Sequence, residues 1–210
     1  MAFEFLIVFI PMFIVIDPFG VMPIYLVLTK SMGAKDRTRT LKYAVAFGGT
    51  LLVAFALVGK VILDYLSVSI DALRIAGGLL LLVIGVMMLY EGDTPRSRRK
   101  GAEEPDEEPH TPEDVAFVPL GTPMLAGPGA ISVVITLTGT AEMPLVLLSL
   151  AVVMLITTLM LWKVDLVFKV IGNAGTRALT RVMGLITSAY AVQMILDGIT
   201  GYVTSTPLLG

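Results

Sequence analysis

The chain has 210 residues, 56% of them hydrophobic, with a mean hydropathy of +0.87. Only 15% of its residues are charged, against about 25% in typical soluble domains, and the apolar residues lie in long blocks, which excludes an ordinary soluble protein. The net charge of −2 indicates no nucleic-acid partner, and the lack of cysteine excludes disulfides, thiolate metal sites and a cysteine nucleophile.

The first apolar block covers residues 5–29, which is long enough to cross a bilayer because a spanning helix needs about 20 apolar residues. Proline removes an amide donor and clashes with the preceding turn, so the block is predicted to be a broken helix at Pro11, Pro18, Gly20 and Pro23. In lipid, broken backbone is tolerated only inside protein or beside a water-filled cavity. We therefore expect this segment to form half of a binding site and to be retained rather than cleaved as a signal peptide.

Five more apolar blocks follow, at residues 43–59, 75–90, 116–138, 144–162 and 182–204. Six such blocks in one short chain leave no surface to cover them in water. We therefore predict an all-α membrane protein with six transmembrane helices. Residues 93–114, between the third and fourth helices, form a charged linker with several prolines, a composition typical of a solvated tether.

The basic residues predict the orientation of these helices. Apart from Lys60 and Arg74, all lysines and arginines lie after the first block, in the linker, or after the fifth block. Because basic loops stay in the cytoplasm, we expect the linker to be cytoplasmic and both termini to lie outside.

The two sides of the linker carry an internal repeat. Pro18 and Pro23 in the first helix are matched by Pro123 and Pro128 in the fourth, and the segment RIAG at 74–77 recurs as RVMG at 181–184. Because each unit, 1–92 and 115–210, has three helices, the second must be inverted in the membrane. Inverted repeats with paired broken helices indicate a substrate site at the midplane, with helices 1 and 4 discontinuous.

Asp17 lies near the centre of the first helix, where an ionised carboxylate costs roughly 2.5–3.5 kcal/mol on the insertion scale. Burial favours its neutral form, so Asp17 is a candidate proton carrier or a ligand for a substrate ammonium. Alternatively, an aspartate directly before Pro18 can cap the following half-helix. The two roles are compatible.

The segment Gly127–Pro128–Gly129 is the candidate break in the fourth helix, although a packing kink is the alternative. Free amides at a half-helix N-terminus attract anions, which suits a small carboxylate substrate. Gln193 could contact substrate or bond a neighbouring helix. The residues expected to bind substrate are Asp17, Pro18, Phe19, Gly20, Pro23, Thr122, Ala126, Gly127, Pro128, Gly129 and Gln193.

Enzyme signatures are missing from the sequence. It has no HExxH or GxSxG motif and no pair of intramembrane aspartates that suits an aspartyl protease, and its one histidine, His110, lies in the linker. We therefore expect that the protein is not an enzyme and that it holds no metal ion or cofactor. A transport function is favoured instead.

Four segments together resemble the MarC family, which includes the SnatA neutral amino acid transporters: IDPFGVMPIYLVLT at 16–29, ALRIAGG at 72–78, AFVPLGTPMLAGPGAI at 116–131, and RVMG with AVQMILDGI in the last helix. The resemblance implies a multi-pass protein of a prokaryotic inner membrane. It also implies transport of glycine, alanine or another small neutral amino acid, driven by an ion gradient, with protons as the expected coupling ion.

The sequence therefore predicts a secondary transporter that alternates access around a site between its halves, with a small zwitterion, protons and the lipid bilayer as its partners. Two alternatives remain open. One is a channel or exporter for another small solute, and the other is a non-transporting membrane scaffold or sensor.

Overall fold

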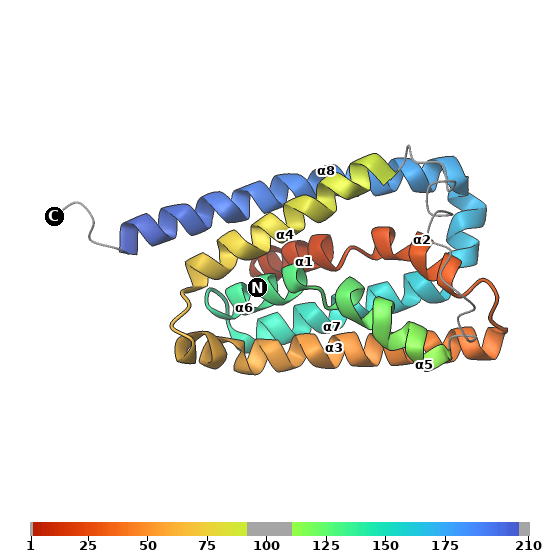
Figure 1. Cartoon of the computed structure of the whole chain (residues 1–210), viewed down its shortest axis with the longest axis horizontal. Coiled ribbons are helices and arrows are strands. Elements are labelled where there is room, and N and C mark those ends of the chain that lie inside the picture. The colour runs from red at the N-terminus through yellow and green to blue at the C-terminus, as the bar shows by residue number, and fades with distance from the viewer. Residues whose placement is uncertain (1, 92–110, 206–210) are drawn as a thin grey trace, which may run out of the picture.

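The computed structural model describes residues 2–91 and 111–205, and every regular element in these ranges is a helix (Figure 1). The first half contains α1 (Ala2–Ile16), α2 (Pro18–Leu28), α3 (Ala34–Tyr65) and α4 (Ile70–Glu91). The second half contains α5 (Pro112–Val115), the π-helix η2 (Ala116–Leu125), α6 (Pro128–Thr138), α7 (Met143–Trp162) and α8 (Val164–Ser205). His110 and most of the predicted linker lie outside the described residues.

Within the described ranges, five helical segments are long and apolar enough to cross a membrane: Phe3–Leu28, Ala34–Tyr65, Ile70–Tyr90, Met143–Trp162 and Ala174–Ser205. The remaining predicted block, 116–138, is divided between η2 and α6. The two pieces are divided at Ala126 and Gly127, which have non-helical backbone angles, and Val118 and Thr122 are extended within η2 itself. Neither piece alone reaches the length of a span.

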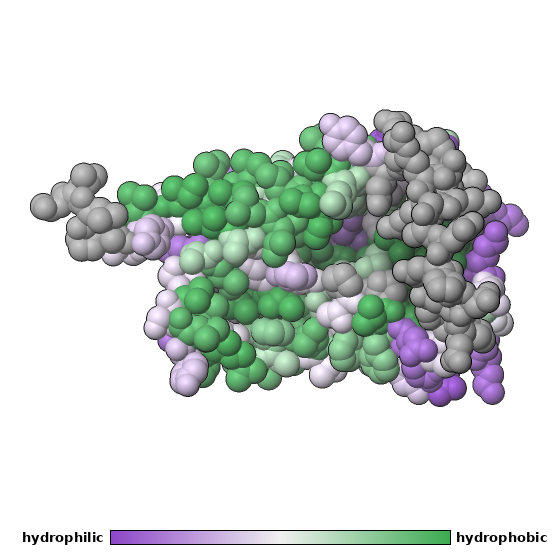
Figure 2. Space-filling view, in the orientation of Figure 1, coloured by the Kyte–Doolittle hydropathy of each residue, from purple (hydrophilic) through white to green (hydrophobic). Residues whose placement is uncertain are grey.

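The surface of the helical body is apolar over most of the length of the helices. In the face drawn in Figure 2, hydrophobic side chains cover α4, α8 and α3, and hydrophilic ones gather at the end where α3 begins. Large apolar side chains point outward even from the middle of helices, such as Leu57, Leu79, Leu155 and Leu185. Such a continuous apolar surface is stable in lipid rather than in water, as expected for a multi-pass membrane protein.

The two halves are interleaved rather than side by side. Helix α2 packs on α8 of the other half, and α6 packs on α4. In the same reciprocal way, α1 packs on α7 and η2 packs on α3. Each interrupted segment is therefore held mainly by helices from the opposite half.

Helices α4 and α8 lie side by side along much of their length (Figure 1). A Cβ atom added at Gly85 would lie 2.8 Å from the Ser188 amide nitrogen and 2.9 Å from the Gly184 carbonyl oxygen. One added at Gly78 would lie 2.8 Å from the Ala191 oxygen. The two backbones therefore touch at these glycines, as small residues allow in membrane helices.

Helix α8 bends sharply near its start. Gly172 has a φ of 72° inside the helix, a conformation that glycine adopts without steric cost. The bend separates a short first segment, next to the end of α7, from the long segment that runs along α4 (Figure 1).

Candidate functional site

The first interruption is at Asp17, between the end of α1 at Ile16 and the start of α2 at Pro18. Asp17 has φ 45° and ψ 68°, the left-handed conformation that aspartate tolerates better than most residues. Its Oδ1 accepts a hydrogen bond of 3.1 Å from the amide of Gly20. This bond satisfies one of the free donors of α2, which confirms the predicted capping role of Asp17.

Pro11 and Pro23 do not end a helix, contrary to the prediction. They lie inside α1 and α2, respectively. A proline removes a single hydrogen bond from a helix, and packing against neighbouring helices lets a membrane helix continue through it. Pro18 differs because it follows Asp17 and takes the first position of α2, where its missing amide hydrogen costs nothing.

The second interruption separates η2 from α6. The backbone is extended at Thr122, with φ −134° and ψ 135°, and again at Gly127, with φ −72° and ψ 164°. Pro128 then starts α6, and no side chain of the described residues caps this helix. Because the first amides of a helix have no intrahelical partner, the amides of Gly129 and Ala130 remain available to a ligand.

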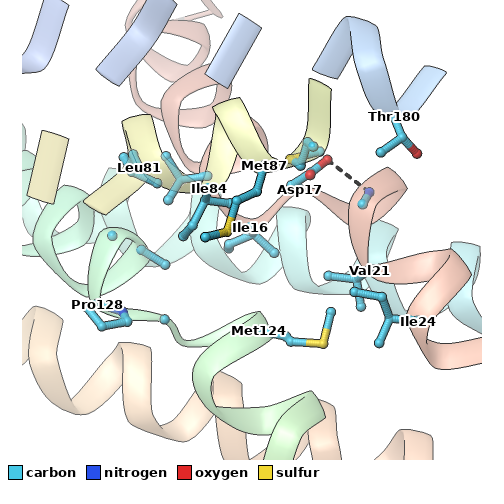
Figure 3. A pocket seen from close by; sticks show the side chains of 16 residues that line it. Ile16, Asp17, Val21, Ile24, Leu81, Ile84, Met87, Met124, Pro128 and Thr180 are labelled. Atoms are coloured by element: carbon cyan, nitrogen blue, oxygen red, sulfur yellow. Dashed lines mark hydrogen bonds between the residues drawn. The ribbon is translucent and has the colours of Figure 1, made fainter. Parts of the chain in front are cut away.

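A cavity of about 280 Å³ lies between the two interruptions. In Figure 3, Asp17 lies on one side of it, with Pro128 and Met124 across from it and Ile84 and Met87 along the wall. This volume lies just below the roughly 300–1,000 Å³ typical of ligand sites. The cavity is therefore suited to a small molecule.

The wall of the cavity is mostly apolar. Asp17 is the one ionisable side chain among the described residues that line it, and Thr180 of α8 supplies a hydroxyl group. Ile84 and Met87 also reach the outer surface, where they are 44% and 58% exposed. The other lining residues are Val15, Ile16, Gly20, Val21, Ile24, Leu81, Met88, Met124, Gly127, Pro128, Gly129 and Ala130.

The cavity brings together five of the predicted site residues: Asp17, Gly20, Gly127, Pro128 and Gly129. The other predicted residues near the interruptions do not line it. Pro18 and Ala126 are buried, Phe19 packs edge-on against Phe13 at 6.1 Å, and the Thr122 hydroxyl donates to the carbonyl oxygen of Phe117 at 3.3 Å. Pro23 is half-buried inside α2.

Gln193 lies away from the cavity. Its side chain is exposed on α8, and Nε2 donates a 2.7 Å hydrogen bond to Oδ1 of Asp197. Residues four apart share one face of a helix, so this amide is satisfied within α8. Of the two roles expected for Gln193, the bond of this amide to a neighbouring helix is not formed.

The sequence interpretation missed the contribution of α4 and of Thr180. Leu81, Ile84, Met87 and Met88 all line the cavity, but α4 is apolar around its whole circumference, so no pattern marks the face that lines a site. Thr180 precedes the predicted sixth helix, 182–204, in a basic segment that the sequence predicts to be a connection between helices.

Comparison with known proteins matches nearly the whole chain to a single protein family. Residues 3–203 match a family model described as MarC family integral membrane protein. The chain is 39% identical over 201 residues to a UPF0056 membrane protein of Methanocaldococcus jannaschii, covering 94% of this chain and 96% of that protein.

Two bacterial proteins are also similar over nearly their full lengths. The UPF0056 membrane protein YvbG of Bacillus subtilis is 31% identical over 206 residues, which cover 96% of this chain and 97% of YvbG. The UPF0056 inner membrane protein MarC of Escherichia coli O1:K1 / APEC is 28% identical over 197 residues, which cover 87% of this chain and 88% of that protein. No solved structure matches the chain significantly.

Proposed function

Because the chain belongs to the MarC family of integral membrane proteins, we propose that it is a secondary transporter of small neutral amino acids that works around the cavity between Asp17 and Gly127. One observation carries this proposal. A carboxylate from the first half and an uncapped helix N-terminus from the second half line the same cavity. Such a pair is complementary to the two charges of a zwitterion.

The carboxylate of the amino acid would bind at the N-terminus of α6. There the amides of Gly129 and Ala130 are free, and the helix dipole favours negative charge. Asp17 would bind the ammonium group. Its Oδ1 is used by the Gly20 amide, but a carboxylate has about four acceptor positions, so capping and binding are compatible.

The halves 1–92 and 115–210 would form two inverted repeats of three membrane helices each, with helices 1 and 4 discontinuous. The reciprocal packing supports this arrangement, since α2 rests on α8 as α6 rests on α4. In transporters built this way, one repeat rocks against the other around a midplane site. The amino acid would then be exposed to each side of the membrane in turn.

Asp17 would also carry the coupling proton. A neutral carboxyl group keeps an oxygen that accepts a hydrogen bond, so protonated Asp17 would still hold the substrate ammonium, by a hydrogen bond in place of the charge pair. Removal from water favours the neutral form of a carboxyl group, and the described cavity wall offers no other ionisable group. The protein would lie in a prokaryotic cell membrane with its basic end and linker in the cytoplasm and both termini outside, as its lysines and arginines indicate.

The apolar wall supports a second candidate function. Leu81, Ile84, Met87 and Met124 offer no polar group to a ligand, which would favour a channel or exporter for a less polar small solute. This candidate keeps the cavity but needs neither a proton nor a zwitterion.

Uptake by purified protein in liposomes tests the proposal. We expect radiolabelled glycine or alanine to accumulate when the outside is made acidic, and unlabelled neutral amino acids to compete. Protein-free liposomes and liposomes without a pH gradient are the controls. If uptake responds neither to the pH gradient nor to competing amino acids, proton-coupled amino acid transport is excluded and the second candidate is favoured.

A further inference from the structure

An ion pair joins the two halves at the basic end of the molecule. Arg37, near the start of α3, donates from Nη1 to Oδ2 of Asp165 at 2.7 Å and from Nη2 to Oδ1 at 3.3 Å. Asp165 lies in the short first segment of α8, before the bend at Gly172. The two parallel bonds fix the geometry of the pair, because the planar guanidinium fits a carboxylate in this arrangement.

The same arginine holds the end of α2. The hydroxyl group of Tyr25 donates to the carbonyl oxygen of Arg37 at 3.1 Å, and the guanidinium carbon lies 5.4 Å from the centre of the Tyr25 ring. Tyr25 is 1% exposed, so α2 cannot shift at this point without disturbing Arg37. Its neighbour Ile24 lines the cavity, as do Val21 and Gly20 one turn earlier.

We propose that Arg37 and Asp165 form a latch that locks α2 to the second half and must open when the cavity becomes accessible from the basic end. This inference rests on the alternating access proposed above. The contacts form one chain from the cavity wall through Tyr25 and Arg37 to Asp165, which crosses from one half to the other.

The exposure of the pair suits a contact that opens repeatedly. The Asp165 side chain is 66% exposed and that of Arg37 is 22% exposed. A pair with a solvated partner adds little to the stability of a fold, so breaking it does not unfold the protein. The ring of Tyr25 keeps Arg37 in place while the pair is open, through a cation–π contact.

Other ion pairs lack this connection to the cavity. At the same end, Arg39 pairs with Glu113 of α5 and thus also joins the halves, but neither residue contacts α2 in the bonds described. Asp71 and Arg74 pair within α4 at 2.9 Å. These two pairs provide matched controls.

Cysteine labelling tests the latch directly, because the natural chain has no cysteine. Val21→Cys places one thiol in the cavity wall, and a membrane-impermeant maleimide is applied to the basic end in inside-out vesicles. We expect Asp165→Asn to speed labelling by up to about fivefold, the population shift that loss of a partly exposed ion pair produces. Asp165→Glu, which keeps the charge, is expected to stay close to the unmodified rate.

The controls separate the latch from general loosening. Glu113→Gln and Asp71→Asn should leave the labelling rate of Val21→Cys unchanged, and an exposed thiol in Lys169→Cys should react equally in all backgrounds. Equal rates with and without Asp165→Asn would overturn the latch, and so would a comparable increase in Glu113→Gln. The labelling does not require transport, so a failure of amino acid uptake would count against the proposed function and not against the latch.

Discussion

Asp17 accepts a hydrogen bond from the Gly20 amide of α2 through Oδ1, and it also lines the cavity. The capping and proton-carrying roles can be separated by replacing it with asparagine. An asparagine oxygen caps a helix as well as aspartate does, and asparagine tolerates the left-handed conformation, but an amide takes up no proton. We expect Asp17→Asn to keep its thermal stability in detergent and to lose gradient-driven uptake.

Asp17→Ala is the matched variant for the capping role. It removes the cap, at about 0.5–2 kcal/mol, and places an alanine in a left-handed conformation, at about 1–2 kcal/mol. We expect a clearly lower unfolding temperature than for Asp17→Asn. Gradient-driven uptake by Asp17→Asn at the unmodified rate would contradict the coupling role and leave capping as the function of this residue.

Gly20 has no room for a side chain. An added Cβ would collide with Oδ2 of Asp17 and lie 3.0 Å from the terminal carbon of Met88. We expect Gly20→Ala to displace the carboxylate and to reduce uptake more strongly than stability. Gly33→Ala, with nothing within 4 Å of the added atom, should leave uptake unchanged, and equal uptake by the two variants would show that the position of the carboxylate is unimportant.

Among the helices, the contact of α4 with α8 depends on missing side chains. A methyl group at Gly85 would press on backbone atoms of Ser188 and Gly184, which cannot rotate away. We expect Gly85→Ala to lower the free energy of unfolding by about 1–3 kcal/mol, as overpacking does. Gly49→Ala is the control, because its nearest neighbour is the flexible end of Met154 at 3.5 Å. Denaturation in detergent measures both, and equal stability would contradict a backbone contact.

Part of the arrangement of elements could be predicted from the sequence. An aspartate followed by proline ends a helix and starts the next, and the structure ends α1 and starts α2 around Asp17. Pro11 and Pro23 carry the same local signal but lie within helices, because tertiary packing decides whether a helix continues past a proline. The share of α4 in the cavity could not be predicted, since a helix that is apolar on every side shows no preferred face.

At the scale of the whole molecule, the distribution of basic residues makes a testable statement about topology. Lys35 and Tyr65 are exposed at opposite ends of α3, so one cysteine at either position reports one side of the membrane. In intact cells we expect an impermeant maleimide to label Tyr65→Cys and to spare Lys35→Cys, with the opposite result in inside-out vesicles. A permeant maleimide should label both, and the reverse pattern would invert the proposed orientation.

The membrane class and the all-helical fold followed from composition, because long apolar blocks have no other stable arrangement in a chain of this length. The interleaving of the two halves could not be predicted from composition. The contact of α2 with α8, and the position of Arg37 opposite Asp165, join residues far apart in the sequence. No local pattern encodes such neighbours. Gln193 is the opposite case, because a polar residue inside an apolar helix was expected to have a distant partner but is hydrogen-bonded to Asp197 of the same helix.

The single carboxyl group in the described cavity wall limits how far transport could be driven. One titratable group carries at most one proton per turnover, and a zwitterion adds no net charge, so each cycle would move one elementary charge. A voltage of 100 mV then supplies about 2.3 kcal/mol, which corresponds to a concentration ratio of about fiftyfold. A lower pH outside raises this maximum ratio. With one proton per amino acid, the voltage and the pH difference together set the steepest concentration gradient that transport can reach.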